Sequence, residues 1–156
     1  MENNGIFLVD KKEGLTSRDV DNIIMRKFNT KKVGHYGTLD PFATGLLIIG
    51  LNKGTKLLQF MDEAKKEYIA TIELGKLTDT YDLTGKVIET KDVPVLTNEN
   101  VLSALYSFLG KSKQIPPLYS AIKVNGKEMY KYARSGEIVD VKERPSFLAS
   151  PSTSSF

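Results

Sequence analysis

Apolar residues recur along the first third of the chain at two different spacings. Continuous apolar runs at residues 6–9 and 46–51 are bounded by glycine or polar residues, which predicts two short buried strands. Between them, four apolar residues follow helical spacing: Val20, Ile23, Ile24 and Phe28. Thr16 or Ser17 can cap this segment as a helix. Residues 31–45 contain three glycines and a proline, which predicts a loop with specific backbone requirements.

A short helix is predicted over residues 55–61, with Leu57, Leu58 and Met61 facing inward. Alternation of apolar and polar residues over 68–74 then indicates a strand, followed by a turn at 79–85 and a partner strand at 86–90. We expect these segments to form a hairpin with a long loop.

The rest of the chain adds two helices and further strands. Thr97 can cap a helix ending near residue 109, whose buried face is predicted from its apolar positions: Val101, Leu102, Leu105 and Phe108. Asn125-Gly126 favours a tight hairpin turn, and a helix over 129–134 ends at Gly136. A last strand is expected near Ile138. Strands and helices without strict alternation predict an α+β fold, with a mixed, largely antiparallel sheet and flanking helices.

Composition narrows the chemistry that the protein can perform. The chain has 156 residues, no cysteine and one histidine, so thiolate metal sites and histidine clusters are excluded, and we expect no metal. A net charge of +3 is a weak pointer to an anionic partner such as nucleic acid. The apolar run at 45–51 is too short to cross a membrane, and the polar N-terminus does not resemble a leader. We therefore expect a monomeric cytoplasmic protein with no membrane partner.

Asp40 is the carboxylate in the most constrained setting, because Gly37 and Gly45 bracket it and Pro41 biases its backbone to an extended conformation. Two interpretations follow. Asp40 either caps a helix that begins at Pro41, or serves as a nucleophilic or acid-base carboxylate. Local sequence favours the cap.

Four separated segments of the chain carry recognisable motifs, and one of them is GHYGTLDPFATG at residues 34–45. It is similar to the signature GHxGTLDPxATG, and the four segments, in the same order along the chain, resemble the TruB family of tRNA pseudouridine synthases. The other three segments are GIFLVDKKEGLTS at 5–17, KKEYIATIELGKLTDT at 65–80 and QIPPLYSAIKVNGKEMYKYARSG at 114–136. One such match could arise by chance, whereas four in order are highly specific.

This resemblance implies isomerisation of uridine 55 in the T loop of tRNA to pseudouridine, without a cofactor. Asp40 is then the catalytic carboxylate, and the attack on ribose or on base is left open. The target uridine must leave its stack, and the resemblance assigns Tyr68 to stack on it and His35 to displace or replace it. For Tyr68 the alternative is core packing, and for His35 it is a loop histidine that bonds backbone. Lys11 matches a basic substrate-binding residue of the family.

Some positions depart from the family pattern. Lys12 stands where proline is usual, Arg18 where histidine often occurs, and Tyr36 where small residues are commoner.

Basic and aromatic side chains alternate further along the chain: Lys123, Lys127, Tyr130, Lys131 and Arg134. Such interleaving is typical of a surface that follows a phosphate backbone, although a packed hairpin and helix explain it almost as well. We expect RNA contact from some of them, including Lys123 and Arg134, and packing for Tyr119 and Tyr132.

The resemblance covers residues 5–145. Residues 1–145 are thus expected to form the N-terminal part of a catalytic domain, and 146–156 a divergent, serine-rich, disordered tail. In the family, the part that would follow holds the rest of the sheet, an arginine that pairs with the catalytic aspartate, and a small RNA-binding domain. We expect the chain alone to be weakly active or inactive and poorly soluble. Three interpretations stay open: an enzyme fragment, a tRNA-binding or tRNA-folding module, and a nonfunctional frameshift product.

Overall fold

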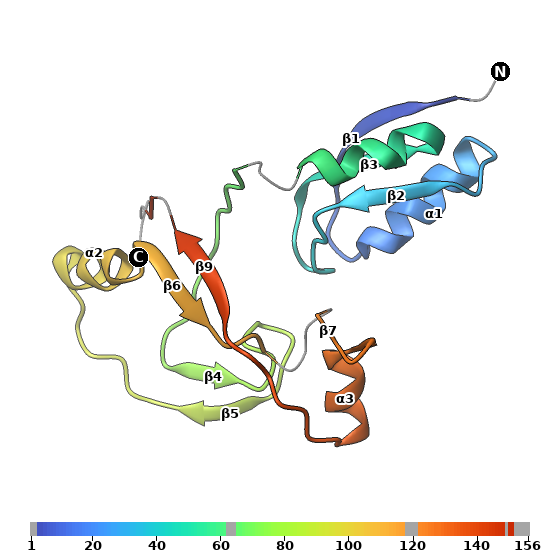
Figure 1. Ribbon diagram of the computed structural model, residues 1–156. Helices are drawn as coiled ribbons and strands as arrows, with labels where there is room; N and C mark the ends of the chain where they lie inside the picture. Colours follow the sequence, from blue (N-terminus) through green and yellow to red (C-terminus); the bar gives the residue numbers. More distant parts are fainter. Residues whose placement is uncertain (1–2, 62–64, 118–121, 149, 152–156) are drawn as a thin grey trace. The chain divides into compact units, whose positions relative to one another are not determined.

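The computed structural model describes residues 3–61, 65–117, 122–148 and 150–151. Contacts between residues divide the chain into two compact units, Met1–Ile69 and Ala70–Phe156, and each unit is described by itself (Figure 1). In the described part of the chain, no helix is long and apolar enough to span a membrane.

The first unit is built on a three-stranded antiparallel sheet. Its strands are β1 (Gly5–Lys11), β2 (Val33–Tyr36) and β3 (Gly45–Leu51), in the order β1-β3-β2. The apolar run of β3 occupies the centre, because it pairs with β1 from Gly5 opposite Leu51 to Lys11 opposite Gly45. The core is formed by Val20, Leu47 and Ile49. The two strands predicted from continuous apolar runs are therefore confirmed.

Helix α1 (Ser17–Lys27) contributes the other side of this core (Figure 1). Thr16 is its N-cap and forms a reciprocal capping box with Asp19, so the predicted cap is confirmed. The expected position of Ile23 in the buried stripe is wrong, since its side chain is 42% exposed. The fully buried positions are Ser17, Val20 and Asp21. Val20 and Asp21 lie three and four positions after Ser17, which is the spacing of one face of a helix, and Ile23 lies off that face.

Two local predictions for this unit are corrected. Residues 33–36 lie inside the predicted loop but form strand β2, because their backbone pairs with β3 from Val33 opposite Leu51 to Tyr36 opposite Ile48. The helix predicted over 55–61 is the 3-10 helix η1 (Asn52–Met61), and Leu57 in it is exposed rather than inward. Gly54 of η1 lies so close to β1 that a Cβ atom at that position would meet the Gly5 carbonyl oxygen at 2.0 Å.

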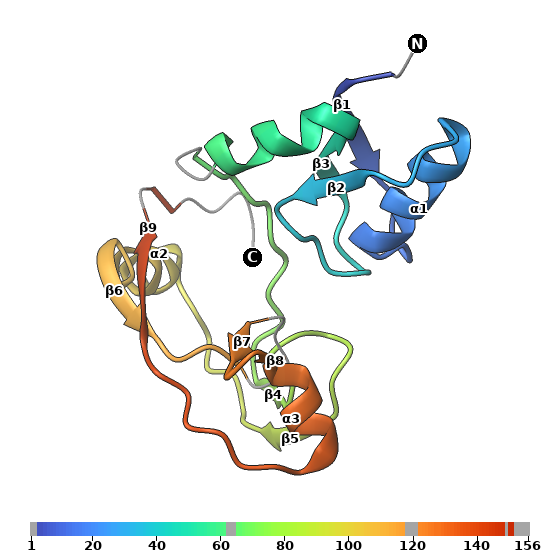
Figure 2. The same ribbon diagram turned by 45° about the vertical axis from the view of Figure 1, so that its right-hand side comes forward.

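The second unit contains three antiparallel two-stranded sheets and two helices. The strands pair as β4 (Lys76–Thr78) with β5 (Val87–Thr90), β6 (Gly110–Gln114) with β9 (Arg144–Leu148), and β7 (Lys123–Val124) with β8 (Lys127–Glu128). The helices are α2 (Asn98–Ser107) and α3 (Met129–Ser135). Figure 2 shows β9 alongside β6. All these pairings are antiparallel, which confirms the predicted α+β class.

Local signals in the second unit correctly predicted its turns and helix caps. Asn125 and Gly126 both have positive φ, 51° and 79°, and join β7 to β8 as a tight hairpin. Thr97 caps α2 through a capping box, and α3 ends at Gly136 with φ of 69°. The hairpin over 76–90 is also confirmed, although its first strand is β4 rather than residues 68–74.

Four other predictions are wrong. No strand covers residues 68–74 or residue 138, because no described backbone pairs with them, and alternation of side chains cannot supply a hydrogen-bonding partner. Phe108, predicted in the buried face of α2, is 64% exposed. The expected start of an unstructured tail at Ser146 also fails for its first residues, since Ser146–Leu148 lie in β9, paired with a strand more than thirty residues earlier. The boundary after residue 145 otherwise stays a prediction.

Candidate catalytic site around Asp40

Asp40 lies in the loop 37–44, which joins β2 to β3. The Ala43 N–H donates to the Asp40 carbonyl oxygen at 3.0 Å, so Asp40 opens a tight turn with Pro41 as its second residue. No helix begins at Pro41. The helix-cap interpretation of Asp40 is therefore wrong, and the carboxylate has no capping duty. Gly37 and Gly45, with φ of +71° and +117°, supply backbone conformations at the two ends of the loop that other residues rarely adopt.

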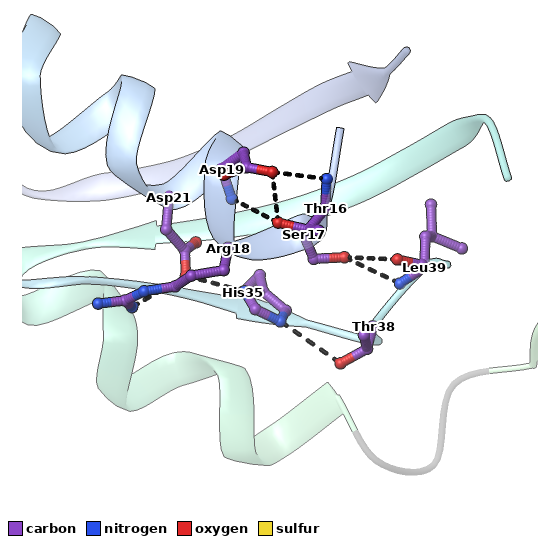
Figure 3. A network of polar contacts seen from close by, with 8 residues as sticks. All are labelled: Thr16, Ser17, Arg18, Asp19, Asp21, His35, Thr38 and Leu39. Carbon is purple, nitrogen blue, oxygen red and sulfur yellow. Dashed lines mark hydrogen bonds and ion pairs between the residues drawn. The ribbon is translucent and has the colours of Figure 1, made fainter. Parts of the chain in front are cut away.

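The residue before Asp40 is held by a buried hydroxyl. The Ser17 Oγ accepts from the Leu39 N–H at 2.9 Å and donates to the Leu39 carbonyl oxygen at 3.1 Å, as Figure 3 shows. Ser17 is only 2% exposed and is the first residue of α1. Both backbone polar groups of Leu39 are thus fixed to the helix.

The residue after Asp40 is held by the end of β1 and the turn that follows it. The Pro41 carbonyl oxygen accepts from the Gly14 N–H at 2.8 Å and from the Lys11 Nζ at 3.3 Å. The same ammonium group donates to the carbonyl oxygens of Leu15, at 2.7 Å, and Lys12, at 3.1 Å. Lys11 is 1% exposed. Its position fits a residue that holds the loop, and substrate contact by Lys11 stays a prediction.

These contacts leave the Asp40 carboxylate as the free group of a fixed loop. Asp40 is exposed, and no described residue donates a hydrogen bond to its side chain or pairs with it. A reactive carboxylate has to approach its target with little loss of orientation, and anchoring of both neighbours limits the backbone freedom of Asp40. The loop can therefore present an anion for nucleophilic or electrostatic work on a bound molecule.

His35 lies in β2, and each of its two ring nitrogens is within hydrogen-bond distance of another side chain. Its Nδ1 is 2.9 Å from the Asp21 Oδ2, and its Nε2 is 3.4 Å from the Thr38 Oγ1 (Figure 3). The Arg18 Nη1 also approaches the Asp21 Oδ2, at 3.4 Å. His35 is thus not a loop histidine that bonds backbone, and Thr38 connects it to the loop of Asp40.

Tyr68 lies in a described segment without regular structure, and its side chain is 72% exposed. The alternative of core packing for Tyr68 is therefore wrong for this structure, whereas its stacking role stays a prediction. The neighbouring Lys66 places its Nζ 4.9 Å from the ring centre of Tyr36. The hydroxyl of Tyr36 is buried and has no partner among the described residues.

The basic and aromatic residues of the second unit lie on the β7-β8 hairpin and α3. Two lysines approach tyrosine rings, Lys127 over Tyr132 at 4.3 Å and Lys131 over Tyr130 at 5.9 Å. Acidic neighbours share this surface: Lys123 and Lys131 pair with Glu128, and Lys127 pairs with Glu137. The Lys131 ammonium lowers the pKa of Glu128, chiefly through a direct hydrogen bond.

Arg134 lies within α3, and the placement of its side chain is outside what the structure describes, as is all of Tyr119. Tyr132 donates its hydroxyl to the Val124 carbonyl oxygen at 3.1 Å, which supports the packing predicted for it. RNA contact by Lys123 and Arg134 stays a prediction.

Ser17 and Asp21 are site residues that the sequence did not reveal. The sequence indicates Ser17 only as a possible helix cap, whereas Thr16 performs that function and leaves the Ser17 hydroxyl free for Leu39. Asp21 lies on the buried face of α1, one turn after Ser17, where a polar residue interrupts the apolar stripe. That interruption was the available signal, because a buried carboxylate requires a partner.

The fold and the site together define a small α+β unit that presents a fixed loop with an exposed aspartate. The sequence model described as TruB family pseudouridylate synthase (N terminal domain) matches residues 25–155. The chain belongs to this family. The match reaches residue 155, which is ten residues beyond the expected end of the resemblance.

Curated relatives agree with this membership. The chain is 50% identical over 143 residues to the tRNA pseudouridine synthase B of Oceanobacillus iheyensis, covering 91% of this chain and 46% of that protein. It is 55% identical over 142 residues to that of Acholeplasma laidlawii, covering 90% and 50% respectively. The chain thus spans about half the length of these relatives. Among solved structures, a chain in a crystal structure of a Cbf5-Nop10-Gar1 complex aligns with 28% identity and a TM-score of 0.49, over 76% of this chain and 31% of that chain.

Proposed function

We propose that this chain carries the catalytic aspartate of a tRNA pseudouridine synthase, and that Asp40 acts on uridine 55 in the T loop of tRNA. The observation that supports this most directly is the anchored loop, in which Leu39 and Pro41 are both held by buried groups while the carboxylate between them is free. A structural aspartate has a bonded carboxylate, as in Asp19, whose Oδ2 accepts from the N–H and the hydroxyl of Thr16.

The chemistry of the isomerisation fits this arrangement. The bond from N1 of uracil to C1′ of ribose must break, the base must turn, and C5 must bond to C1′. A carboxylate can attack or stabilise the electron-poor centre during this exchange, and it leaves unchanged when the new bond forms. His35 and the exposed Tyr68 are proposed to contact the extruded nucleotide, since unstacking a base requires surfaces that replace its neighbours.

The test is release of tritium from C5-labelled uridine in tRNA, followed under single-turnover conditions with an excess of the chain. Asp40→Asn keeps the shape of the side chain and removes the carboxylate. Asp92→Asn is a matched control, because Asp92 is an exposed aspartate in an irregular segment of the second unit. We expect Asp40→Asn to abolish release and Asp92→Asn to retain it. Equal release by the wild type and Asp40→Asn rejects the role of Asp40.

A second candidate function is tRNA binding without catalysis, and the β7-β8 hairpin with α3 favours it. Residues 123–137 contain four basic and two acidic residues, a net charge of +2, next to the lysine and tyrosine contacts of α3. Such a surface binds phosphates and offers aromatic faces to unpaired bases.

This candidate is tested by the salt dependence of tRNA affinity. We expect the affinity to fall as salt rises, and Lys127→Ala to weaken binding and flatten the slope by about one charge. Lys65→Ala serves as the control, since it removes an exposed lysine of the first unit. Binding without tritium release supports the module over the enzyme, whereas affinity that is indifferent to salt rejects the basic surface.

A further inference from the structure

Asp21 is a buried carboxylate on the inner face of α1, and removing a carboxylate from water costs free energy. Its side chain is 1% exposed, and its Oδ1 is buried without a hydrogen-bond partner among the described residues. Its Oδ2 carries all its described contacts, to the His35 Nδ1 at 2.9 Å and to the Arg18 Nη1 at 3.4 Å. Burying a carboxylate costs free energy, so Asp21 is a candidate for a role other than packing.

The geometry of the pair determines which ring nitrogen of His35 carries the proton. An ionised carboxylate has only acceptor oxygens, so the Nδ1 that faces Asp21 must be the donor. In a neutral ring the Nε2 is then unprotonated and can only accept. A histidine side chain free in water prefers the opposite form, with the proton on Nε2. Asp21 therefore reverses the intrinsic preference of the ring.

The nitrogen left unprotonated faces the loop of Asp40. The Nε2 is 3.4 Å from the hydroxyl of Thr38, which stands two residues before Asp40. The His35 side chain is 20% exposed, so a molecule at the loop can reach the ring. A carboxylate that fixes the far nitrogen of an imidazole is a common way to hold both its tautomer and its orientation.

We propose that Asp21 is a positioning residue that holds neutral His35 in the Nδ1–H form, so that the Nε2 accepts a hydrogen bond at the Asp40 loop. The ligand group that fits is an N–H or O–H donor of an RNA nucleotide, such as the imide of uracil or a ribose hydroxyl. This deepens the proposed function and rests on it for the identity of the ligand. The tautomer itself depends only on the contact between Asp21 and His35.

The test uses the fact that the chain has one histidine, so its imidazole signals need no assignment. Nitrogen-15 NMR of the full chain, in alkaline buffer in which imidazoles are neutral, distinguishes the protonated from the unprotonated ring nitrogen. We expect the wild type to be Nδ1–H. In Asp21→Leu, which removes the acceptor and retains a similar volume, we expect the preference for Nδ1–H to fall at least about tenfold, as loss of a charge-assisted hydrogen bond implies.

Two further variants separate this role from a general effect on the fold. Asp19→Asn weakens the cap of the same helix without touching His35, and we expect it to keep the wild-type tautomer. Thr38→Val removes the hydroxyl at the Nε2 and is also expected to keep it. If the wild type is Nε2–H, or if Asp21→Leu stays Nδ1–H, the proposal is overturned. If Asp19→Asn shifts the tautomer as far as Asp21→Leu, the effect is structural and the proposal is likewise overturned.

An activity measurement links the tautomer to the reaction. We expect Asp21→Leu and His35→Ala to slow tritium release by similar factors and the double variant to be no slower, because Asp21 acts through His35. Additive losses contradict the proposal. Absence of release from every variant, including the wild type, rejects the proposed function for this chain, and the NMR result then decides the role of Asp21 by itself.

Discussion

Removal of the Ser17 hydroxyl tests whether the loop of Asp40 is fixed by α1. Ser17→Ala deletes one atom that both accepts from the Leu39 N–H and donates to the Leu39 carbonyl oxygen. Neither group of Leu39 has another partner among the described residues, so without the Ser17 hydroxyl both must bond water or remain unpaired. The change is local, since the capping box of α1 depends on Thr16 and Asp19 instead.

The expected loss of stability follows from these two bonds. Each is worth about 1 kcal/mol net, and a backbone group left unsatisfied in the interior costs about 1–3 kcal/mol. Alanine in place of serine returns up to about 0.5 kcal/mol through its higher helix propensity. We therefore expect Ser17→Ala to lower the free energy of unfolding of the first unit by about 2–3 kcal/mol, a large part of a stability of about 5–15 kcal/mol.

The assay is urea unfolding followed through the ring-proton resonance of His35, which lies in the first unit. A lower midpoint with an unchanged slope indicates lost stability rather than a changed unfolded state. Thr44→Ala is the matched control, because Thr44 is an exposed residue of the same loop whose hydroxyl has no partner among the described residues, and we expect a change within about 0.5 kcal/mol. If Ser17→Ala also stays within about 0.5 kcal/mol of the wild type, the hydroxyl does not hold the loop and the reasoning fails.

Three other perturbations test separate features. Gly54→Ala should destabilise the first unit by about 3 kcal/mol or more in the same urea assay, because its Cβ would lie 2.0 Å from the Gly5 carbonyl oxygen. A decrease in the free energy of unfolding of less than about 1 kcal/mol would contradict this close approach. Burial raises the pKa of Asp82, but hydrogen bonds from Thr84 and Thr80 outweigh it and leave the pKa lowered. Asp82 thus stabilises the folded state above its unfolded pKa near 4, and this stabilisation is lost as the pH falls through its lower folded pKa. Asp82→Asn should therefore reduce the loss of stability of the second unit on acidification. An unchanged loss of stability at acid pH would refute this role of Asp82. Thr97→Ala removes the capping box of α2 and should lower the helicity measured by circular dichroism. It should also lower the free energy of unfolding of the second unit by about 1 kcal/mol. An unchanged spectrum and an unchanged unfolding midpoint would show that the cap is dispensable.

Features that depend on adjacent residues were predictable from the sequence. The cap at Thr16, the hairpin turn at Asn125-Gly126 and the αL end of α3 at Gly136 are each determined by a few neighbouring residues. The strand at 45–51 was also predictable, because a run of seven apolar or glycine residues between turn signals fits a central strand.

Features that depend on distant pairing were not predictable. Strand β2 has an irregular, glycine-containing sequence and exists because β3 offers it a partner. Residues 68–74 show the opposite case, since their alternation fits a strand but no described segment pairs with them. Strand β9 was missed because its partner, β6, is more than thirty residues away.

In the candidate site, too, residues could be selected from local sequence, whereas their long-range contacts could not be predicted. Asp40 and His35 could be selected because the signature at 34–45 contains them, and Lys11 because the similar segment at 5–17 does. The long-range contacts around these residues could not be predicted from the sequence: Ser17 with Leu39, Lys11 with Pro41, and Asp21 with His35 each join residues 14 to 30 positions apart. The helix cap expected at Asp40 failed for a local reason, since the chain turns once at Pro41 and then enters β3.

The two hydrogen bonds between Ser17 and Leu39 also have a consequence for motion. The Leu39 amide is bonded to the first residue of a helix whose inner face forms part of the core, so its hydrogen can exchange with solvent only when loop and helix separate. Its exchange should therefore be slow for a loop amide and should follow the opening of the whole first unit. On this view the backbone beside Asp40 does not sample a separate open state, and any molecule that reacts there has to be brought to the carboxylate.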